Sequence, residues 1–184
     1  MTQQVRRVRV RHGEPFAELR ETAARFATGV SVVTTEVDHV PMGMTVNAFT
    51  MVSLEPQLLL VCLHRRSRLA PAIRTSGVFA VTILAADQDC VASWFASPGR
   101  PVGDICFAGI PTHGDRATGC PVLSEGVAYF GCAVDREDPA GDHVVVIGEI
   151  VSFGLLRPAP LLLFADGCYS ELGTDVEEPH AARR

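Results

Sequence analysis

Short apolar and β-branched runs recur along this chain, and turn-forming residues separate them. Runs of this kind, bounded by glycine, proline or aspartate, are typical of β-strands. The runs that predict strands lie at residues 30–37, 40–56, 58–63, 78–84, 127–135, 143–153 and 161–164. Helical periodicity occurs in only three short segments, so the sequence predicts a mainly β fold, a β-barrel with a few short helices.

The predicted helices are short, and a long loop follows the third. They run from Pro15 to a stop at Thr28-Gly29, from Leu69 to Gly77, and from the cap Asp87 to Phe95. The apolar face of the first is formed by Phe16, Leu19, Ala23 and Phe26. Residues 111–121 are rich in glycine, proline and polar side chains, which predicts a loop.

The run from Val40 to Pro56, VPMGMTVNAFTMVSLEP, carries no charge before Glu55. If it is one strand, the period of two places Met44, Val46 and Ala48 on one face and Thr45, Asn47 and Phe49 on the other. Asparagine is depleted in strands, and a buried amide needs partners for its donors and its acceptor. The polar face therefore indicates a surface that receives a polar, planar ligand edge-on.

Two motifs in this chain resemble one known family. GMTVNAFTMVSLEP resembles the (G/A)-(M/F)-T-x-N-S-F-x-S-V-S-x-x-P segment of the flavin reductase-like, FMN-binding split-barrel family, and Gly141 to Glu149 resembles its G-D-H-x-x-x-x-G-E. The similarity extends from about Phe16 to Leu172. Two separated matches in the right order are more specific than either match alone.

The resemblance implies a split β-barrel with Greek-key-like topology and an NAD(P)H-dependent flavin reductase. Such an enzyme binds FMN or FAD, takes a hydride from NADH or NADPH, and supplies reduced flavin to a partner flavin-dependent monooxygenase. The family also implies a homodimer, with the flavin at or near the two-fold interface. The sequence does not choose between FMN and FAD or between NADH and NADPH.

Several residues are candidates for flavin contacts through this resemblance. The ring and ribityl chain are assigned to Met44, Thr45, Val46, Asn47, Ala48 and Ser53, with backbone contacts from Cys62 and Leu63. Phe107 and Tyr169 are further candidates beside the flavin or the nicotinamide. Two alternatives stay open: Asn47 caps a local turn, and Phe107 packs in the core.

Ser67 and Arg68 are candidates for the flavin phosphate. They lie where a predicted strand ends and a helix begins, and a helix N-terminus offers free amides and a positive dipole end. The arginine fork matches phosphate oxygens. The alternative for the neighbouring Arg65 and Arg66 is a solvated cluster at a strand end.

His143 is the candidate catalytic residue. It follows the predicted Gly141-Asp142 turn and starts a strand. In similar reductases the histidine of this motif lies where the nicotinamide docks, which implies an orienting role. The alternative is a turn histidine bonded to Asp142.

Composition excludes several classes of protein. All 16 basic residues are arginine, so a lysine-dependent phosphate loop and lysine Schiff-base chemistry are excluded. The net charge of −5 disfavours a nucleic-acid binder. The six cysteines form no Cys-x-x-Cys pair and the histidines show no metal-ligand spacing, so no metal site is expected.

We expect one domain at 15–172, a mobile basic tail at 1–14 and a disordered tail at 173–184. The first 15 residues lack the apolar core of a signal peptide, and no apolar run approaches the ~18 residues of a membrane span. Scattered cysteines within apolar runs favour a reduced, cytoplasmic protein.

Two other functions fit the same fold. One is a flavin-binding electron-transfer protein with no nicotinamide site. The other is a barrel that binds haem or serves as an interaction module. Fold does not fix function, so the residues of the site must separate them. Thr45, Asn47 and Ser67 favour a flavin site, and His143 favours the reductase.

Overall fold

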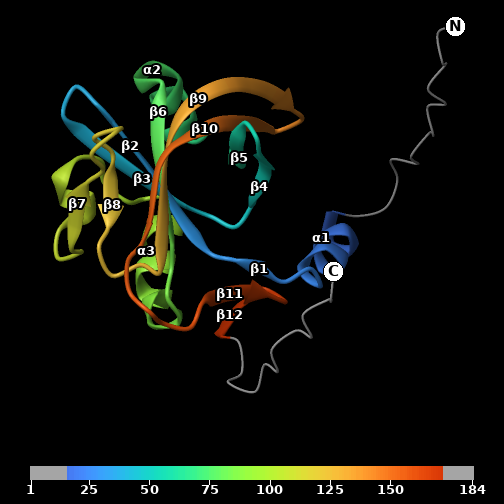
Figure 1. Cartoon of the computed structure of the whole chain (residues 1–184). Coiled ribbons are helices and arrows are strands. Elements are labelled where there is room, and N and C mark those ends of the chain that lie inside the picture. The colour runs from blue at the N-terminus through green and yellow to red at the C-terminus, as the bar shows by residue number, and fades with distance from the viewer. Residues whose placement is uncertain (1–15, 172–184) are drawn as a thin grey trace, which may run out of the picture.

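A computed structural model describes residues 16–171, and a seven-stranded antiparallel sheet forms its centre (Figure 1). Along the sheet the strands follow the order β3-β2-β6-β9-β10-β5-β4. These strands are β2 (Ser31–Val37), β3 (Val40–Val46), β4 (Phe49–Leu54), β5 (Gln57–His64), β6 (Val78–Ile83), β9 (Ala128–Ala140) and β10 (His143–Leu155). The prediction of a mainly β fold is confirmed.

Smaller elements surround this sheet. Short strands form a three-stranded sheet from β1 (Thr28–Gly29), β11 (Leu162–Ala165) and β12 (Cys168–Glu171), and a hairpin from β7 (Thr112–Gly114) and β8 (Pro121–Leu123). The α-helices are α1 (Phe16–Ala24), α2 (Leu69–Ser76) and α3 (Asp89–Ala96), and the 3₁₀ turns are η1 (Ala86–Gln88) and η2 (Asp104–Phe107). In Figure 1, α1 stands to one side of the barrel, next to β1.

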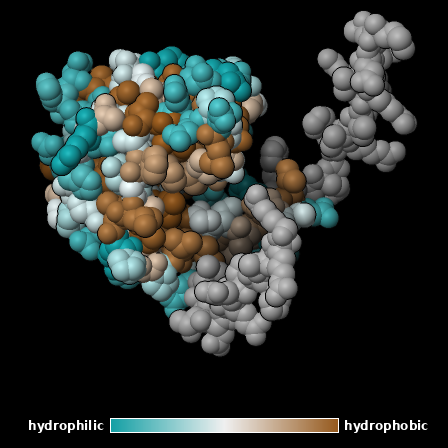
Figure 2. Space-filling model, viewed as in Figure 1, coloured by the Kyte–Doolittle hydropathy of each residue, from teal (hydrophilic) through white to brown (hydrophobic). Residues whose placement is uncertain are grey.

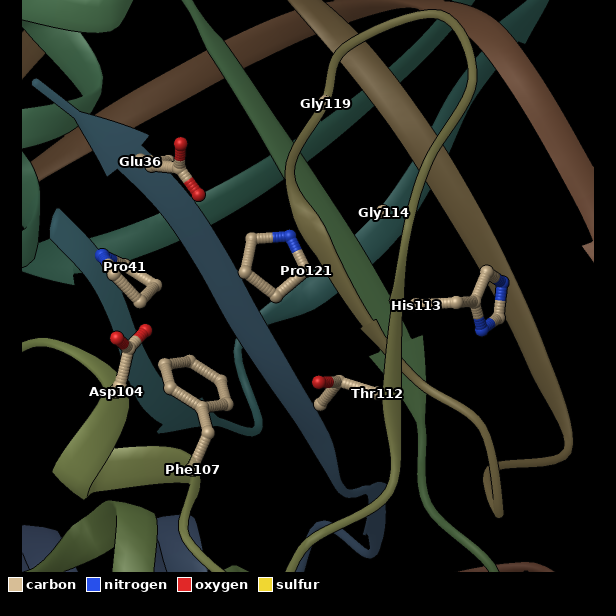
Figure 3. A pocket seen from close by; sticks show the side chains of 9 residues that line it. All are labelled: Glu36, Pro41, Asp104, Phe107, Thr112, His113, Gly114, Gly119 and Pro121. Atoms are coloured by element: carbon tan, nitrogen blue, oxygen red, sulfur yellow. The ribbon is translucent and has the colours of Figure 1, made fainter. Parts of the chain in front are cut away.

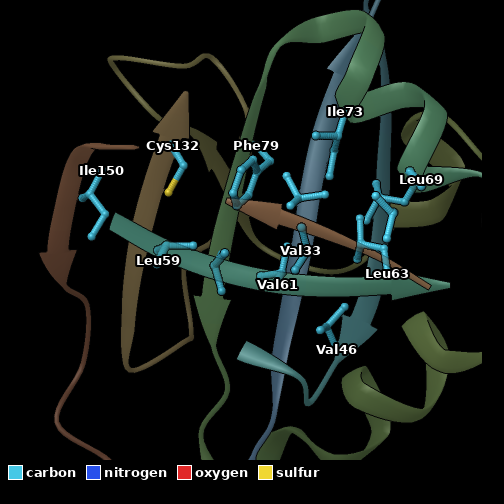
Figure 4. Packing of buried hydrophobic residues seen from close by; sticks show 14 residues of the cluster. Val33, Val46, Leu59, Val61, Leu63, Leu69, Ile73, Phe79, Cys132 and Ile150 are labelled. Atoms are coloured by element: carbon cyan, nitrogen blue, oxygen red, sulfur yellow. The ribbon is translucent and has the colours of Figure 1, made fainter. Parts of the chain in front are cut away.

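Strands from both ends of the large sheet contribute to one hydrophobic core. Val46 on the edge strand β3 and Val61 on β5 belong to the same buried cluster as Phe79 on β6 (Figure 4). Phe49 on β4, the other edge strand, packs against this cluster. A sheet whose two ends share a core is curled into a barrel. Helix α2 covers this core with Leu69 and Ile73, which are almost fully buried.

Tight turns fix the register of the long hairpins. Asp38 and His39 join β2 to β3 with positive φ angles of 50° and 62°. Gly141, with a φ of 65°, turns β9 into β10 and places His143 opposite Ala140. Glycine and aspartate adopt such angles at little steric cost, so both turns follow from the sequence.

Three predicted boundaries are wrong. Helix α1 ends at Ala24, and Thr28-Gly29 is strand β1, because its backbone pairs with Leu163 and Phe164 on β11. Residues 111–121 are not one loop, since both ends pair as the β7–β8 hairpin. Asp87 does not cap α3, because that helix begins at Asp89. The Asp87 carboxylate accepts a hydrogen bond from Arg157 instead.

The run from Val40 to Pro56 is two strands rather than one. It breaks at Asn47 and Ala48, between β3 and β4. The break resets the alternation, so Phe49 packs against the same core as Met44 and Val46, on the face opposite to the predicted one. Hydrophobic burial of the phenylalanine ring outweighs continuation of the strand at this point.

The predicted tails, 1–14 and 173–184, lie outside the described residues. Between residues 16 and 171, no helix is both long and apolar enough to cross a membrane.

Replacing Gly148 by alanine is expected to destabilise the barrel by about 1–3 kcal/mol, because inserting a methyl group into a packed core forces its neighbours to shift. A Cβ at Gly148 would lie 2.6 Å from Cζ of the buried Phe79 and 2.9 Å from Cβ of Cys132. Gly99→Ala is the matched control, because nothing lies within 4 Å of the added Cβ there. Urea unfolding measures both, and equal free energies of unfolding for the two variants would contradict the expectation.

Candidate functional site

A pocket of about 340 Å³ lies beside the break between β3 and β4. It is lined by Ala23, Phe26, Thr28, Asn47, Ala48, Phe49, Thr50, Leu60 and Cys62. Its walls therefore come from α1 and the segment after it, from the β3–β4 break, and from the half-buried face of β5. Of the predicted flavin residues, the structure brings Asn47, Ala48 and Cys62 together here.

The break leaves the Asn47 side chain free. The residue is exposed, and within residues 16–171 its amide makes no hydrogen bond, so the predicted alternative of a turn cap is not observed. The Ala48 carbonyl accepts the Cys62 backbone N–H at 2.9 Å, which fixes the break to β5. An amide on a fixed backbone with no partner of its own is suited to the polar edge of a ligand.

Thr28 also lines the pocket, which the sequence did not indicate. Its Oγ1 is buried, and within residues 16–171 it has no hydrogen-bond partner. Together with the apolar walls of Phe26 and Leu60, the exposed amide of Asn47 fits a planar aromatic ring with polar edges, and the pocket volume suits such a ring.

Other predicted ring contacts have their side chains engaged elsewhere. Val46 and Leu63 are buried in the barrel core, and Met44 packs against it. Thr45 donates its hydroxyl to the Ala92 carbonyl at 2.6 Å, and Ser53 accepts the Glu55 N–H at 3.2 Å. None of these five residues lines the pocket.

The loop between β5 and α2 carries the predicted phosphate contacts. The Ser67 hydroxyl accepts a hydrogen bond from the N–H of Ala70, in the first turn of α2, at 3.2 Å. Arg68 is exposed, and one arm of its guanidinium donates to the Arg100 carbonyl. Arg65 and Arg66 are exposed, and their guanidinium groups make no hydrogen bond within the described part of the chain, as expected for a solvated cluster.

His143 begins β10 directly opposite His64, the last residue of β5. Its Nδ1–H donates to Oδ1 of Asp142 at 2.8 Å, and this hydrogen bond lowers the pKa of the Asp142 carboxyl below its ordinary value. The bond predicted for a turn histidine is therefore present. It also fixes the imidazole ring and leaves Nε2 available to a ligand. The ring of His64 meets that of His143 edge-on, with centroids 5.3 Å apart.

Strand β5 connects these three parts of the site. Cys62 lines the pocket, and His64, two residues further on and so about 7 Å along the strand, faces His143. The strand then leads directly into the loop of Ser67 and Arg68. A single rigid strand thus sets the spacing between the pocket, the histidine and the cationic loop.

Phe107 and Tyr169 lie outside this pocket. Phe107 is buried against Phe95 with ring centroids 5.3 Å apart, and Tyr169 packs on Phe164. The alternative of core packing for Phe107 is therefore the one observed. Its ring also borders a second pocket of about 380 Å³ between η2 and the β7–β8 hairpin (Figure 3). Glu36 and Asp104 line that pocket, and their carboxylates disfavour a phosphorylated ligand.

Sequence reasoning missed Phe26 and Thr28 as pocket residues and Arg100 as a partner of Arg68. Phe26 is predicted on the apolar face of the first helix, yet it follows the end of α1 and is 78% exposed. The Thr28-Gly29 pair is typical of a helix end, so the sequence did not predict that it forms strand β1. No local signal marks Arg100, because its contacts come from residues distant in sequence.

No group of three or more histidine, cysteine, aspartate or glutamate side chains between residues 16 and 171 is arranged to hold a metal ion.

Comparisons with known proteins identify the family and the fold. The Flavin reductase like domain family matches residues 23–173, and the chain belongs to this family. The Streptomyces globisporus NADH:FAD oxidoreductase SgcE6, solved in complex with NAD and FAD fragments, is 30% identical and superposes with a TM-score of 0.81, over 88% of this chain and 94% of that one. The split-barrel prediction is confirmed.

Two curated relatives are also similar in sequence. The flavin-dependent monooxygenase reductase subunit HsaB of Rhodococcus jostii (strain RHA1) is 35% identical over 87% of this chain and 80% of its own length. A Rhizobium meliloti (strain 1021) protein named "Probable flavin reductase" is 43% identical over 73% of this chain. The match spans only 42% of that relative's length.

Proposed function

We propose that this protein is an NADH-dependent flavin reductase that supplies reduced FMN or FAD to a partner monooxygenase. The observation that carries the proposal is the arrangement around β5: a ring-sized pocket, a fixed histidine and a cationic loop lie along one strand. An electron carrier needs only the pocket and the loop. His143 supplies a place for a second ring beside the first.

Flavin, when bound, accepts a hydride from reduced nicotinamide and later releases its electrons to an acceptor. The residues of this chain bind and orient. Asn47 bonds the polar edge of the ring, and the apolar side chains of Phe26 and Leu60 pack against the ring. The hydrogen bond to Asp142 fixes the orientation of the His143 imidazole, and Nε2 of that ring orients the nicotinamide.

The relatives support the choice of substrates and acceptor. The similar Streptomyces enzyme is an NADH:FAD oxidoreductase, which favours NADH over NADPH. The similar Rhodococcus protein is the reductase subunit of a flavin-dependent monooxygenase, which favours an oxygenase as the acceptor of the reduced flavin.

The proposal is tested by following NADH consumption with FMN, FAD or no added flavin. We expect consumption that saturates with flavin concentration and is faster with NADH than with NADPH. Flavin that binds to the purified protein while neither nicotinamide is consumed would overturn the reductase and leave an electron carrier.

We also propose that the protein is a homodimer. Several large apolar side chains are exposed on α1, β4 and β10, and hydrophobic surface gathers over the lower half of the face in view in Figure 2. Leu54 is 81% exposed on β4, one of the two edge strands of the large sheet, and Leu155 is 90% exposed at the end of β10. Exposed apolar surface next to an unpaired sheet edge is typical of a subunit interface.

Leu155→Glu is expected to weaken the dimer at least about tenfold, because burying a charge in an apolar interface is costly. Ser170→Glu on β12 is the matched control, since it adds the same charge at an exposed polar position. Sedimentation velocity at micromolar concentration measures both. A wild-type protein that sediments only as a species near 19.7 kDa would contradict the homodimer.

A cytoplasmic location follows from the same proposal. All six cysteines are free thiols, as in a reducing compartment, and the proposed substrate NADH is a metabolite of that compartment.

A further inference from the structure

Arg100 carries a buried positive charge on the loop after α3. The residue is only 9% exposed. Its Nε donates to the Gly43 carbonyl at 2.7 Å and its Nη1 donates to the Ser97 carbonyl at 2.9 Å. One guanidinium thereby fastens the loop after α3 to β3 at Gly43, directly before Met44, the first of the predicted ring contacts.

The backbone of Arg100 has a second task. Its carbonyl accepts a hydrogen bond from Nη2 of Arg68, which lies in the loop between β5 and α2. Arg100 therefore links the strand that leads to the pocket with the arginine proposed to contact phosphate. The remaining N–H groups of the Arg68 fork stay free to bond another acceptor.

The two arginines have no negative partner. Among residues 16–171, no carboxylate lies within 4.0 Å of either guanidinium, whereas Arg25, Arg74, Arg136 and Arg157 each have at least one such partner. Burial and the neighbouring charge of Arg68 lower the pKa of Arg100. Two cations held together without an anion are stabilised when an anionic ligand binds beside them.

Gly43 allows α3 to pack closely on β3 next to the carbonyl that Arg100 bonds. A Cβ on Gly43 would lie 2.7 Å from Cε1 of Phe95, so α3 packs directly on the strand there. The Gly43 carbonyl that Arg100 bonds is therefore held at a fixed distance from α3 and from the loop that follows it.

We infer that Arg100 is a positioning residue that holds Arg68 in place to bind the phosphate of the flavin. This inference rests on the proposed function. A fork held by its neighbour loses less conformational freedom on binding than a free arginine does, which increases the affinity for the phosphorylated ligand. Arg100 thereby contributes to the preference for FMN over riboflavin without touching the ring.

The test compares the dissociation constants of FMN and riboflavin, measured by quenching of flavin fluorescence. We expect Arg100→Met to weaken FMN about tenfold and to change riboflavin less than about twofold, because only the phosphate contact is lost. Arg68→Met should show the same pattern. Arg74→Met is the matched control. Arg74 lies in the last turn of α2 and pairs with Glu137 on β9, so this variant should leave both dissociation constants unchanged.

Arg100→Lys separates position from charge and serves if the methionine variant does not fold. Lysine keeps the charge but cannot bond both carbonyls through a planar fork, so FMN should still be weakened. Wild-type FMN affinity in Arg100→Lys would overturn the positioning role, as would equal losses for FMN and riboflavin in Arg100→Met.

Inorganic pyrophosphate gives an independent readout. We expect it to compete with FMN in the wild type and much less in Arg100→Met, and equal competition in both proteins would also overturn the inference. A wild type that binds neither flavin would refute the proposed function, whereas a wild type that binds FMN and riboflavin equally would refute this inference alone.

Discussion

Replacing His143 by alanine is expected to slow reduction by NADH about ten- to a hundredfold, because a misplaced hydride donor loses alignment rather than chemistry. Flavin affinity should stay nearly unchanged, since His143 is not among the residues that line the pocket. The basis is geometric: Asp142 fixes the imidazole from one side, and His64 meets its ring from the other.

Rapid mixing at saturating flavin measures this rate. Reduction by dithionite should be unaffected, because that reaction needs no nicotinamide site. His113→Ala is the matched control, since His113 is exposed, bonds Ser124 and lies at the second pocket. A His143→Ala protein that reacts with NADH as fast as wild type would return His143 to the role of a turn residue.

Replacing Asn47 by alanine is expected to weaken flavin binding by about 1–3 kcal/mol, roughly five- to a hundredfold or more, because ring-edge groups buried in the complex lose their partner. Asn47 is well suited to show the effect. Its amide has no partner within the described chain, so the substitution removes no hydrogen bond from the free protein.

Fluorescence titration with FMN and with riboflavin measures the affinity of the Asn47 variant. The affinities for FMN and riboflavin should fall by the same factor, because Asn47 contacts the ring that both flavins share. In the Arg100 variants only the affinity for FMN should fall. Gln57→Ala removes an exposed amide at the opposite end of β5 and should change neither constant. An unchanged dissociation constant in Asn47→Ala would remove this residue from the site.

Most of the strands could be predicted from periodicity, because hydrophobic alternation and turn residues are local signals. The turns at Asp38-His39 and Gly141-Asp142 follow in the same way from residues that tolerate positive φ. The break at Asn47 could not be predicted by alternation. Phe49 changes face there because the core has room for its ring, and that depends on β9, where Phe130 packs against it.

The residues of the site also differ in whether local sequence signals could predict them. Cys62 lies on a strand with a clear pattern, and Asn47 and Ala48 lie in the motif that resembles a known family; all three line the pocket. Thr28 joins them only because β1 pairs with β11, which is more than 130 residues away in the chain. Arg100 reaches Gly43 and Arg68 through tertiary packing that no local sequence pattern encodes.

The most direct test of the central claim is anaerobic mixing of the flavin-loaded protein with NADH, followed by the loss of oxidised flavin absorbance. The account predicts complete bleaching at a rate that saturates with NADH, faster than with NADPH, and regeneration of oxidised flavin when oxygen is admitted. Flavin that stays oxidised with both nicotinamides, yet is bleached by dithionite, would contradict it.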